Sequence, residues 1–215
     1  TATDNYLAPF CNVLGNSSDE HAVIRNLKVV TNITADDYRH TAGLMAKAWG
    51  YVDVNNCDIT ANITATKGSQ TDLYPAGITS QVTSGTQLTV SGCTVGGTIE
   101  TNGKYAAGYV GILQGSASIQ NSVSSVNIQS STSGDGIHGG FVAVVNNGQS
   151  LTIEGCLFNG KIVTTNGTTK CGGFVGHDKG TGVTITNSLY APTTDDNTVS
   201  EGCATFGRNV ADANI

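Results

Sequence analysis

The apolar positions along this chain recur with a period of about 32 residues. The clearest anchor is a Gly-Gly-Phe-Val sequence at Gly139–Val142, which returns at Gly172–Val175. Weaker copies align on these two and give one column of large apolar residues, spaced by 34, 34, 31, 32, 33 and 32 residues. The members of this anchor column are Phe10, Leu44, Ile78, Tyr109, Phe141, Phe174 and Phe206. Such regular recurrence predicts a repeat architecture.

A second block, in which apolar and polar residues alternate, follows each anchor. Apolar residues two apart, such as Leu151 and Ile153, lie on the same face of a strand. Two residues later comes a column that contains only Asn or Gly, the residues that best tolerate the left-handed backbone conformation. We therefore expect the chain to bend at this column and to begin a new strand. The bend column is Asn26, Asn56, Gly92, Asn121, Gly155 and Asn187.

Three short strands separated by bends predict that each repeat forms one coil of a solenoid. A coil cannot bury its apolar residues alone, so neighbouring coils must stack. We predict an all-β, parallel, right-handed β-helix of about six coils with roughly 32 residues per coil, forming a single domain over residues 1–215. The Leu spacing of a leucine-rich repeat is absent from this sequence, and its Gly, Thr and Ile content disfavours the helices of an ankyrin repeat. A β-sandwich does not produce columns in register.

The composition excludes several classes of partner. The chain has 10 Lys and Arg residues, a net charge of −6 and no basic cluster, so we expect no nucleic-acid binding, which depends on neutralising phosphates. No run of 18 apolar residues occurs, and we expect no membrane insertion. The pattern stops mid-repeat at both ends. We therefore expect a part of a larger surface protein or an assembly in which copies stack end to end.

The sequence Gly172–Gly176, followed by an Ile-x-Asn-Ser or Ile-x-Gly-Cys bend, resembles the GLUG-type repeat, which is named for Gly-Leu-hydrophobic-Gly. The resemblance covers roughly residues 6 to 208 and is best at Gly108–Gly111, Gly140–Ala143 and Gly173–Gly176. The early copies lack the closing Gly. The family occurs in large adhesin-like surface proteins and in the non-catalytic part of some IgA-type peptidases. The resemblance implies an extracellular or cell-surface location and a structural or adhesive role, and it carries over no catalytic residue.

Five of the six cysteines form two groups, and Cys11 has no evident partner. Cys57, Cys93 and Cys156 share a column with Leu and Ser, which indicates buried packing positions. Cys171 and Cys203 occupy one turn column in adjacent coils near the C-terminal end. A turn can adapt to the geometry of a disulfide, so we predict a bond between these two.

The residue after each anchor aromatic is a candidate docking residue. If the anchor points inward, strict alternation points its neighbour outward. Val110, Val142 and Val175 would then form an exposed apolar column that needs a cover. The cover is either the chain itself or another domain or chain.

No cluster of residues indicates catalysis, a cofactor or a metal site. The carboxylates do not form a column across adjacent coils, as a glycoside hydrolase or lyase on this fold would require. Cys and His lack the spacing of zinc ligands. We predict that the chain is not an enzyme. The alternatives are a carbohydrate-active β-helix, or a glycan-binding one in which tyrosines or Trp49 stack on sugars.

Overall fold

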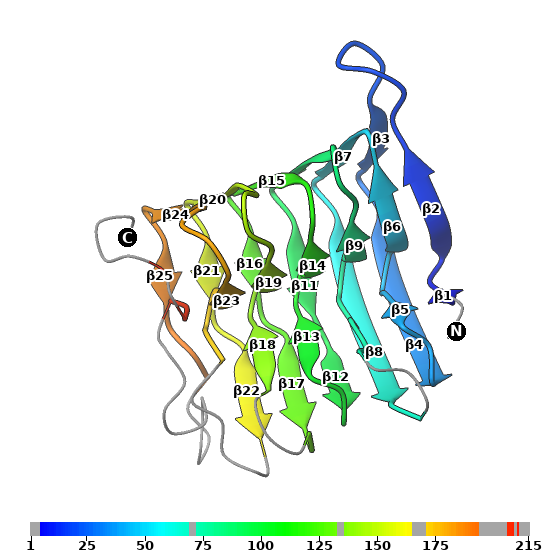
Figure 1. Ribbon diagram of the computed structural model, residues 1–215, viewed down its shortest axis with the longest axis vertical. Helices are drawn as coiled ribbons and strands as arrows, with labels where there is room; N and C mark the ends of the chain where they lie inside the picture. Colours follow the sequence, from blue (N-terminus) through cyan, green and yellow to red (C-terminus); the bar gives the residue numbers. More distant parts are fainter. Residues whose placement is uncertain are drawn as a thin grey trace.

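The fold is an all-β solenoid. The computed structural model describes residues 5–68, 72–132, 136–164, 171–193, 206–208 and 210. The regular elements in these ranges are β-strands that pair in parallel and stack into about five turns, spaced by roughly 32 residues (Figure 1). The predicted parallel β-helix is confirmed, with about five turns where about six were expected.

Two faces of the solenoid are six-stranded sheets in which each strand pairs with its equivalents in the next and previous coils. The anchor face consists of β2 (Phe10–Leu14), β6 (Met45–Trp49), β9 (Thr79–Val82), β14 (Val110–Leu113), β19 (Val142–Val145) and β23 (Val175–Asp178). The second face consists of β3 (Ala22–Arg25), β7 (Tyr51–Asn55), β10 (Gln87–Ser91), β15 (Ser116–Gln120), β20 (Leu151–Glu154) and β24 (Val183–Thr186).

The third face begins with two long strands and then divides. The long strands are β4 (Lys28–Asp36) and β8 (Asp58–Thr66), which pair over nine residues. One ladder continues from β8 through β11 (Thr94–Gly96), β16 (Val123–Ser124), β21 (Leu157–Phe158) and β25 (Leu189–Tyr190). The other continues through β12 (Thr98–Thr101), β17 (Asn127–Ser130) and β22 (Lys161–Thr164).

The bends between the second and third faces lie at the predicted Asn and Gly column. All six members have a positive φ, between 48° and 64°. A left-handed residue turns the chain sharply without interrupting the ladders on either side, and Asn and Gly adopt this conformation at the lowest cost. This prediction is confirmed at every repeat.

The anchor column forms the centre of the core. Tyr109, Phe141 and Phe174 are fully buried. Their rings stack from coil to coil, with centroids 4.7 Å apart for Tyr109 and Phe141 and 5.2 Å apart for Phe141 and Phe174. Parallel strands in register bring identical positions within stacking distance, so a repeated aromatic becomes a continuous ladder.

A second, smaller cluster covers the outer side of the anchor face. Before each anchor the chain runs through a short strand: β1 (Tyr6–Leu7), β5 (His40–Thr41), β13 (Tyr105–Ala107) or β18 (Ile137–Gly139). Tyr105 and Ile137 of this layer pack with Ile112 and Val144. Leu113 and Val145, which follow those two residues along the chain, belong to the main core, so Ile112 and Val144 point to the opposite side. Each coil therefore covers part of its own outer surface.

Candidate functional site

The three valines predicted as a docking face are not at the surface. Val110, Val142 and Val175 are all 0% exposed and belong to the main core together with the anchor aromatics. The prediction of an exposed apolar column is wrong, because it assumed that alternation continues across the anchor. The backbone N–H groups of Tyr109 and Val110 both donate to the carbonyl of Phe141, which marks a corner at this point. Both side chains therefore point inward.

The cysteine column is buried, as expected for packing positions. Cys57, Cys93 and Cys156 are at most 2% exposed and are not joined by disulfides. The Cys93 thiol donates to the Ser91 carbonyl two residues earlier at 3.5 Å, and its sulfur accepts the N–H of Cys57 at 3.4 Å. Burial raises the pKa of the Cys93 thiol to about 11, so it remains protonated at neutral pH.

Serine takes the same part where it replaces cysteine in this column. The Ser122 hydroxyl accepts the N–H of Cys93 at 3.1 Å and donates to the carbonyl of Gln120 at 2.7 Å. Thiols and hydroxyls thus form a chain of hydrogen bonds that closes the bends from coil to coil. This column stabilises the fold and does not form a reactive site.

The predicted disulfide is described at one end only. Cys171 is buried and belongs to the main core. Cys203 lies outside the described residues. The Cys171–Cys203 bond therefore remains a prediction.

Most aromatic residues considered for stacking on sugars are also inside the protein. Tyr109 is fully buried, and its hydroxyl donates to the carbonyls of Cys93 and Val123 at 2.8 Å. Tyr74 and Tyr105 are 5% and 7% exposed. Trp49 is 42% exposed, with the ammonium group of Lys47 5.7 Å from its ring. A row of tyrosines is therefore not offered to a ligand.

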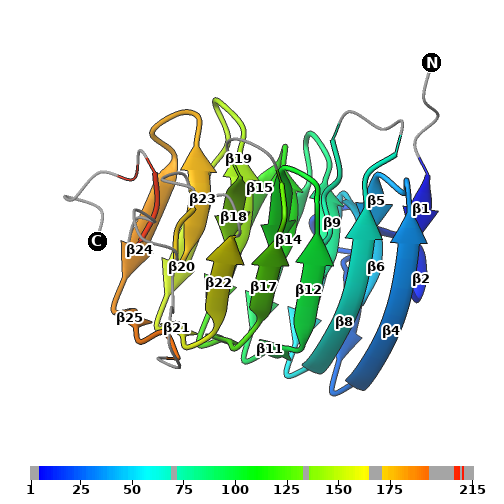
Figure 2. The same cartoon turned by 90° about the horizontal axis from the view of Figure 1, so that it is seen from below.

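The third face presents a regular polar surface, which we call the polar face. Figure 2 shows β4, β8, β12, β17 and β22 side by side on this side of the solenoid. Their Ile residues point into the core, so the residues on either side of each Ile point out. One outward column is Asn32, Asn62, Thr98, Asn127 and Lys161. The next is Thr34, Thr64, Glu100, Gln129 and Val163.

Three shallow grooves follow one another along the polar face. The largest, of about 380 Å³, lies between Glu100, Gln129, Lys161 and neighbouring residues. The other two, of about 260 and 210 Å³, lie towards β4 and towards the end of β8. Glu100 lines all three, and it is the sole carboxylate among the residues that line them. The grooves thus offer amides, hydroxyls, one acid and one ammonium group.

Hydrogen bonds between coils hold the side chains of the polar face in place. The Asn62 amide nitrogen donates to the Asn32 amide oxygen at 3.0 Å. The Thr66 hydroxyl donates to Asp36 at 2.8 Å. In-register parallel pairing sets these like positions beside each other. The arrangement is preorganised to hydrogen-bond an extended polar ligand.

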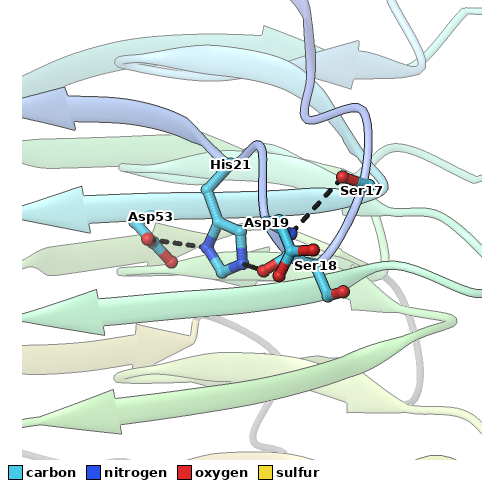
Figure 3. A network of polar contacts seen from close by, with 5 residues as sticks. All are labelled: Ser17, Ser18, Asp19, His21 and Asp53. Carbon is cyan, nitrogen blue, oxygen red and sulfur yellow. Dashed lines mark hydrogen bonds and ion pairs between the residues drawn. The ribbon is translucent and has the colours of Figure 1, made fainter.

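A histidine–aspartate pair lies at the base of the first hairpin (Figure 3). Nδ1 of His21 is 2.8 Å from Oδ2 of Asp53, and Nε2 is 3.1 Å from the carbonyl oxygen of Ser18. The imidazole also stacks on Tyr51, with ring centroids 5.3 Å apart. Both ring nitrogens are thus engaged, one by a carboxylate and one by a backbone carbonyl. It fastens the hairpin to the second coil.

His177 and Asp178 are the last two residues of strand β23 and do not form a surface turn. Asp178 is 1% exposed, and its carboxylate accepts the N–H groups of Gly180 at 3.0 Å and Val183 at 3.3 Å. Partial burial, together with Arg208 and Lys179, lowers the pKa of His177. Asp178 therefore closes the loop that leads into β24.

The described part of the chain holds no group of three or more His, Cys, Asp or Glu residues that could bind a metal ion. No helix in the same ranges is long and apolar enough to cross a membrane. Comparisons with models of protein families, with curated proteins and with solved structures found no match.

Sequence reasoning did not single out the polar face. The signal was present, because the residue after each closing Ile must point outward from a strand whose Ile points inward. The sequence does not show that this side of the coil stays exposed. Nor does it show that a second layer covers the outer side of the anchor face.

Proposed function

We propose that this chain is a non-catalytic structural and adhesive module of an extracellular or cell-surface protein, of the kind that the GLUG-type resemblance implies. The observation that supports the proposal is that the repeated columns and the polar face have different roles. The repeated apolar, Cys/Ser and Asn/Gly columns are used to build the interior and the bends. Of the outward surfaces, the polar face has the largest of the grooves described above, of about 380 Å³.

The grooves support a second candidate function, which is glycan binding by the polar face. Amide and hydroxyl groups can both donate and accept hydrogen bonds, which suits polyhydroxylated ligands. Glu100 and Gln129 stand in register on β12 and β17 and line the largest groove. A carbohydrate-active enzyme is less well supported, since Glu100 has no second carboxylate among the lining residues.

Binding and turnover measured on the same material test these functions. Labelled protein is applied to immobilised neutral and anionic polysaccharides, and the polysaccharides are then assayed for new reducing or unsaturated ends. We expect binding that falls about tenfold in the double variant Glu100→Gln/Gln129→Ala, since each lost hydrogen bond contributes about 0.5–1.5 kcal/mol. No new chain ends should appear.

The matched control is Ser118→Ala, an outward residue in β15 on the second face. It should leave binding unchanged. Chain ends that accumulate with the parent protein but not with Glu100→Gln would show that the module is an enzyme. Equal binding by the double variant and the parent would exclude the polar face as the glycan site.

A further inference from the structure

The two ends of the solenoid are not equivalent. At the C-terminal end Val183 and Ile185 of β24, the last strand of the second face, are each 1% exposed. Their counterparts at the N-terminal end, Ala22 and Ile24 of β3, are only half-buried. Among the residues that the structure describes, seven large apolar side chains are exposed, and six of them lie within the first coil or at its contact with the second. These residues are Phe10, Leu14, Val23, Leu27, Val30 and Trp49. Among the described residues, the first coil therefore exposes more large apolar side chains than the coils that follow it.

The longest free edge at this end belongs to β4. In the part of the chain that the structure describes, β4 pairs with β8 alone. The Leu27 carbonyl and the Asp37 N–H, both at odd positions, are used towards β8. Peptide groups alternate in direction along a strand, so the even residues from Lys28 to Asp36 direct their N–H and C=O groups to the free edge.

The sequence of this edge is complementary to itself when one copy is turned antiparallel to another. If Asn32 lies opposite Asn32 of a second copy, Lys28 lies opposite the partner copy's Asp36, and Val30 opposite the partner copy's Thr34. The two-fold axis generates the Lys–Asp contact twice. These are all even positions, which is the phase that the free peptide groups require. All five even residues are exposed.

The charged ends of the edge are available for a partner. Lys28 and Asp58 are 3.6 Å apart, and their side chains are 76% and 54% exposed, so this contact within the chain is loose. Asp36 accepts one hydrogen bond, from Thr66, at one of its two carboxylate oxygens. Opposite charges directly across an antiparallel pair stabilise it, and like charges destabilise it.

The first hairpin leaves this end clear. It folds back over the second coil, where His21 binds Asp53 and stacks on Tyr51 (Figure 3). A head-to-tail contact would instead need an uncovered last coil, whereas the last strand of the second face is covered. A two-fold contact between N-terminal ends buries the open end of both copies and closes, so it does not propagate into a fibre.

We propose that two copies of this chain associate head to head through antiparallel pairing of their β4 edges, with Asn32 on the two-fold axis. This inference deepens the proposed scaffold role by naming a partner, and it does not depend on glycan binding. The dimer unites the two third faces into one continuous sheet, which doubles the length of the polar face.

Molar mass in solution, measured by sedimentation velocity over a range of concentrations, tests the proposal. We expect a dimer for the parent protein. Lys28→Asp or Asp36→Lys alone places like charges opposite each other twice and should raise the dissociation constant by about tenfold or more. The double variant Lys28→Asp/Asp36→Lys restores opposite charges and should dimerise again.

Mixing gives the sharpest arm of this experiment. The Lys28→Asp copy carries two acids at the edge and the Asp36→Lys copy carries two bases, so the mixture should form a heterodimer although each alone is monomeric. Lys161→Asp, the same charge change at the far end of the sheet in β22, is the matched control and should dimerise like the parent. Far-UV circular dichroism checks that each variant is folded.

Two outcomes would overturn the proposal. One is a parent protein that stays monomeric at every concentration, which would mean that Lys28 and Asp36 protect the edge from pairing. The other is a dimer that neither single charge reversal weakens. Neither outcome bears on the glycan assay, which a monomer with an intact polar face can pass.

Discussion

At the residue scale, His138 is the side chain that the fold accommodates least comfortably. It lies in β18, in register with Ala106 of the previous coil, and it is 0% exposed. Neither ring nitrogen has a hydrogen-bond partner among the described residues. Burial without a partner disfavours the charged imidazolium and lowers the pKa of His138 from 6.5 to about 4.

This buried histidine predicts a loss of stability in acid. Above pH 6.5 the ring is neutral in both the folded and the unfolded chain, and it contributes no pH dependence. As the pH falls from 6.5 to 4, the unfolded chain binds a proton that the folded chain does not, so the free energy of unfolding falls. At about 1.4 kcal/mol per pKa unit the full loss is roughly 3 kcal/mol. Urea unfolding between pH 7.5 and pH 4 measures it.

The control for this effect is His138→Leu, which removes the titrating group and keeps an apolar side chain of similar size. The decrease in stability between pH 6.5 and pH 4 should shrink by most of the predicted amount, while the contribution of His177 stays the same in both proteins. An identical pH slope in the two proteins would show that His138 gains a partner or solvent in the folded state.

At the element scale, Gly140, directly before the anchor residue Phe141, allows two adjacent coils to approach closely. A Cβ atom built on Gly140 would overlap the carbonyl oxygen of Gly173 in the next coil and the ring of Phe158 across the core. Neither neighbour can move, because Gly173 is backbone and Phe158 is fully buried. Glycine is required at this position because the backbones of two adjacent coils are almost in contact.

Gly140→Ala should therefore destabilise the protein by about 3 kcal/mol, in the upper range for overpacking a core. Gly96→Ala is the matched control, since a Cβ there would meet no atom closer than 3.9 Å, the Cβ of Ser125. Its effect should stay within about 0.5 kcal/mol. Chemical denaturation of both variants measures the difference, and equal stabilities would contradict the close approach at Gly140.

The corner at Tyr109–Val110 shows how much of the element structure the sequence predicts. Alternation holds inside the strands of the second face, and the bend and cysteine columns that follow these strands are as predicted. It fails at Tyr109–Val110, because the backbone turns there and both side chains enter the core. The covering strand β13 was also not predicted, since its cluster of Tyr105, Ile112 and Val144 repeats in only part of the chain.

At the scale of the whole molecule, the sequence largely predicts the scaffold of the solenoid. It does not predict which of the surfaces are exposed. In-register columns specify a core, because each repeated residue meets its own kind in the next coil. The polar face and the open end depend on what is left uncovered. Glu100 and Lys161 share a groove through strand pairing across three coils, and β4 is an edge because its far side has no neighbour among the described strands.

The unequal ends predict a gradient of local stability along the solenoid. In a repeat protein each coil is stabilised chiefly by its neighbours, so an end coil without a cover opens most easily.

Hydrogen exchange followed by mass spectrometry, on Lys28→Asp as the expected monomer, should show β3 exchanging faster than β24, although both are terminal strands of the same sheet. Ile24 is half-buried where Ile185 is 1% exposed, and about one CH₂ group of additional burial corresponds to about 0.8 kcal/mol, or roughly fourfold in exchange rate. β15, in the middle of the same sheet, serves as the protected reference. Equal protection of β3 and β24 would mean that β3 is already covered in the monomer. It would contradict an exposed surface for a second copy at this end.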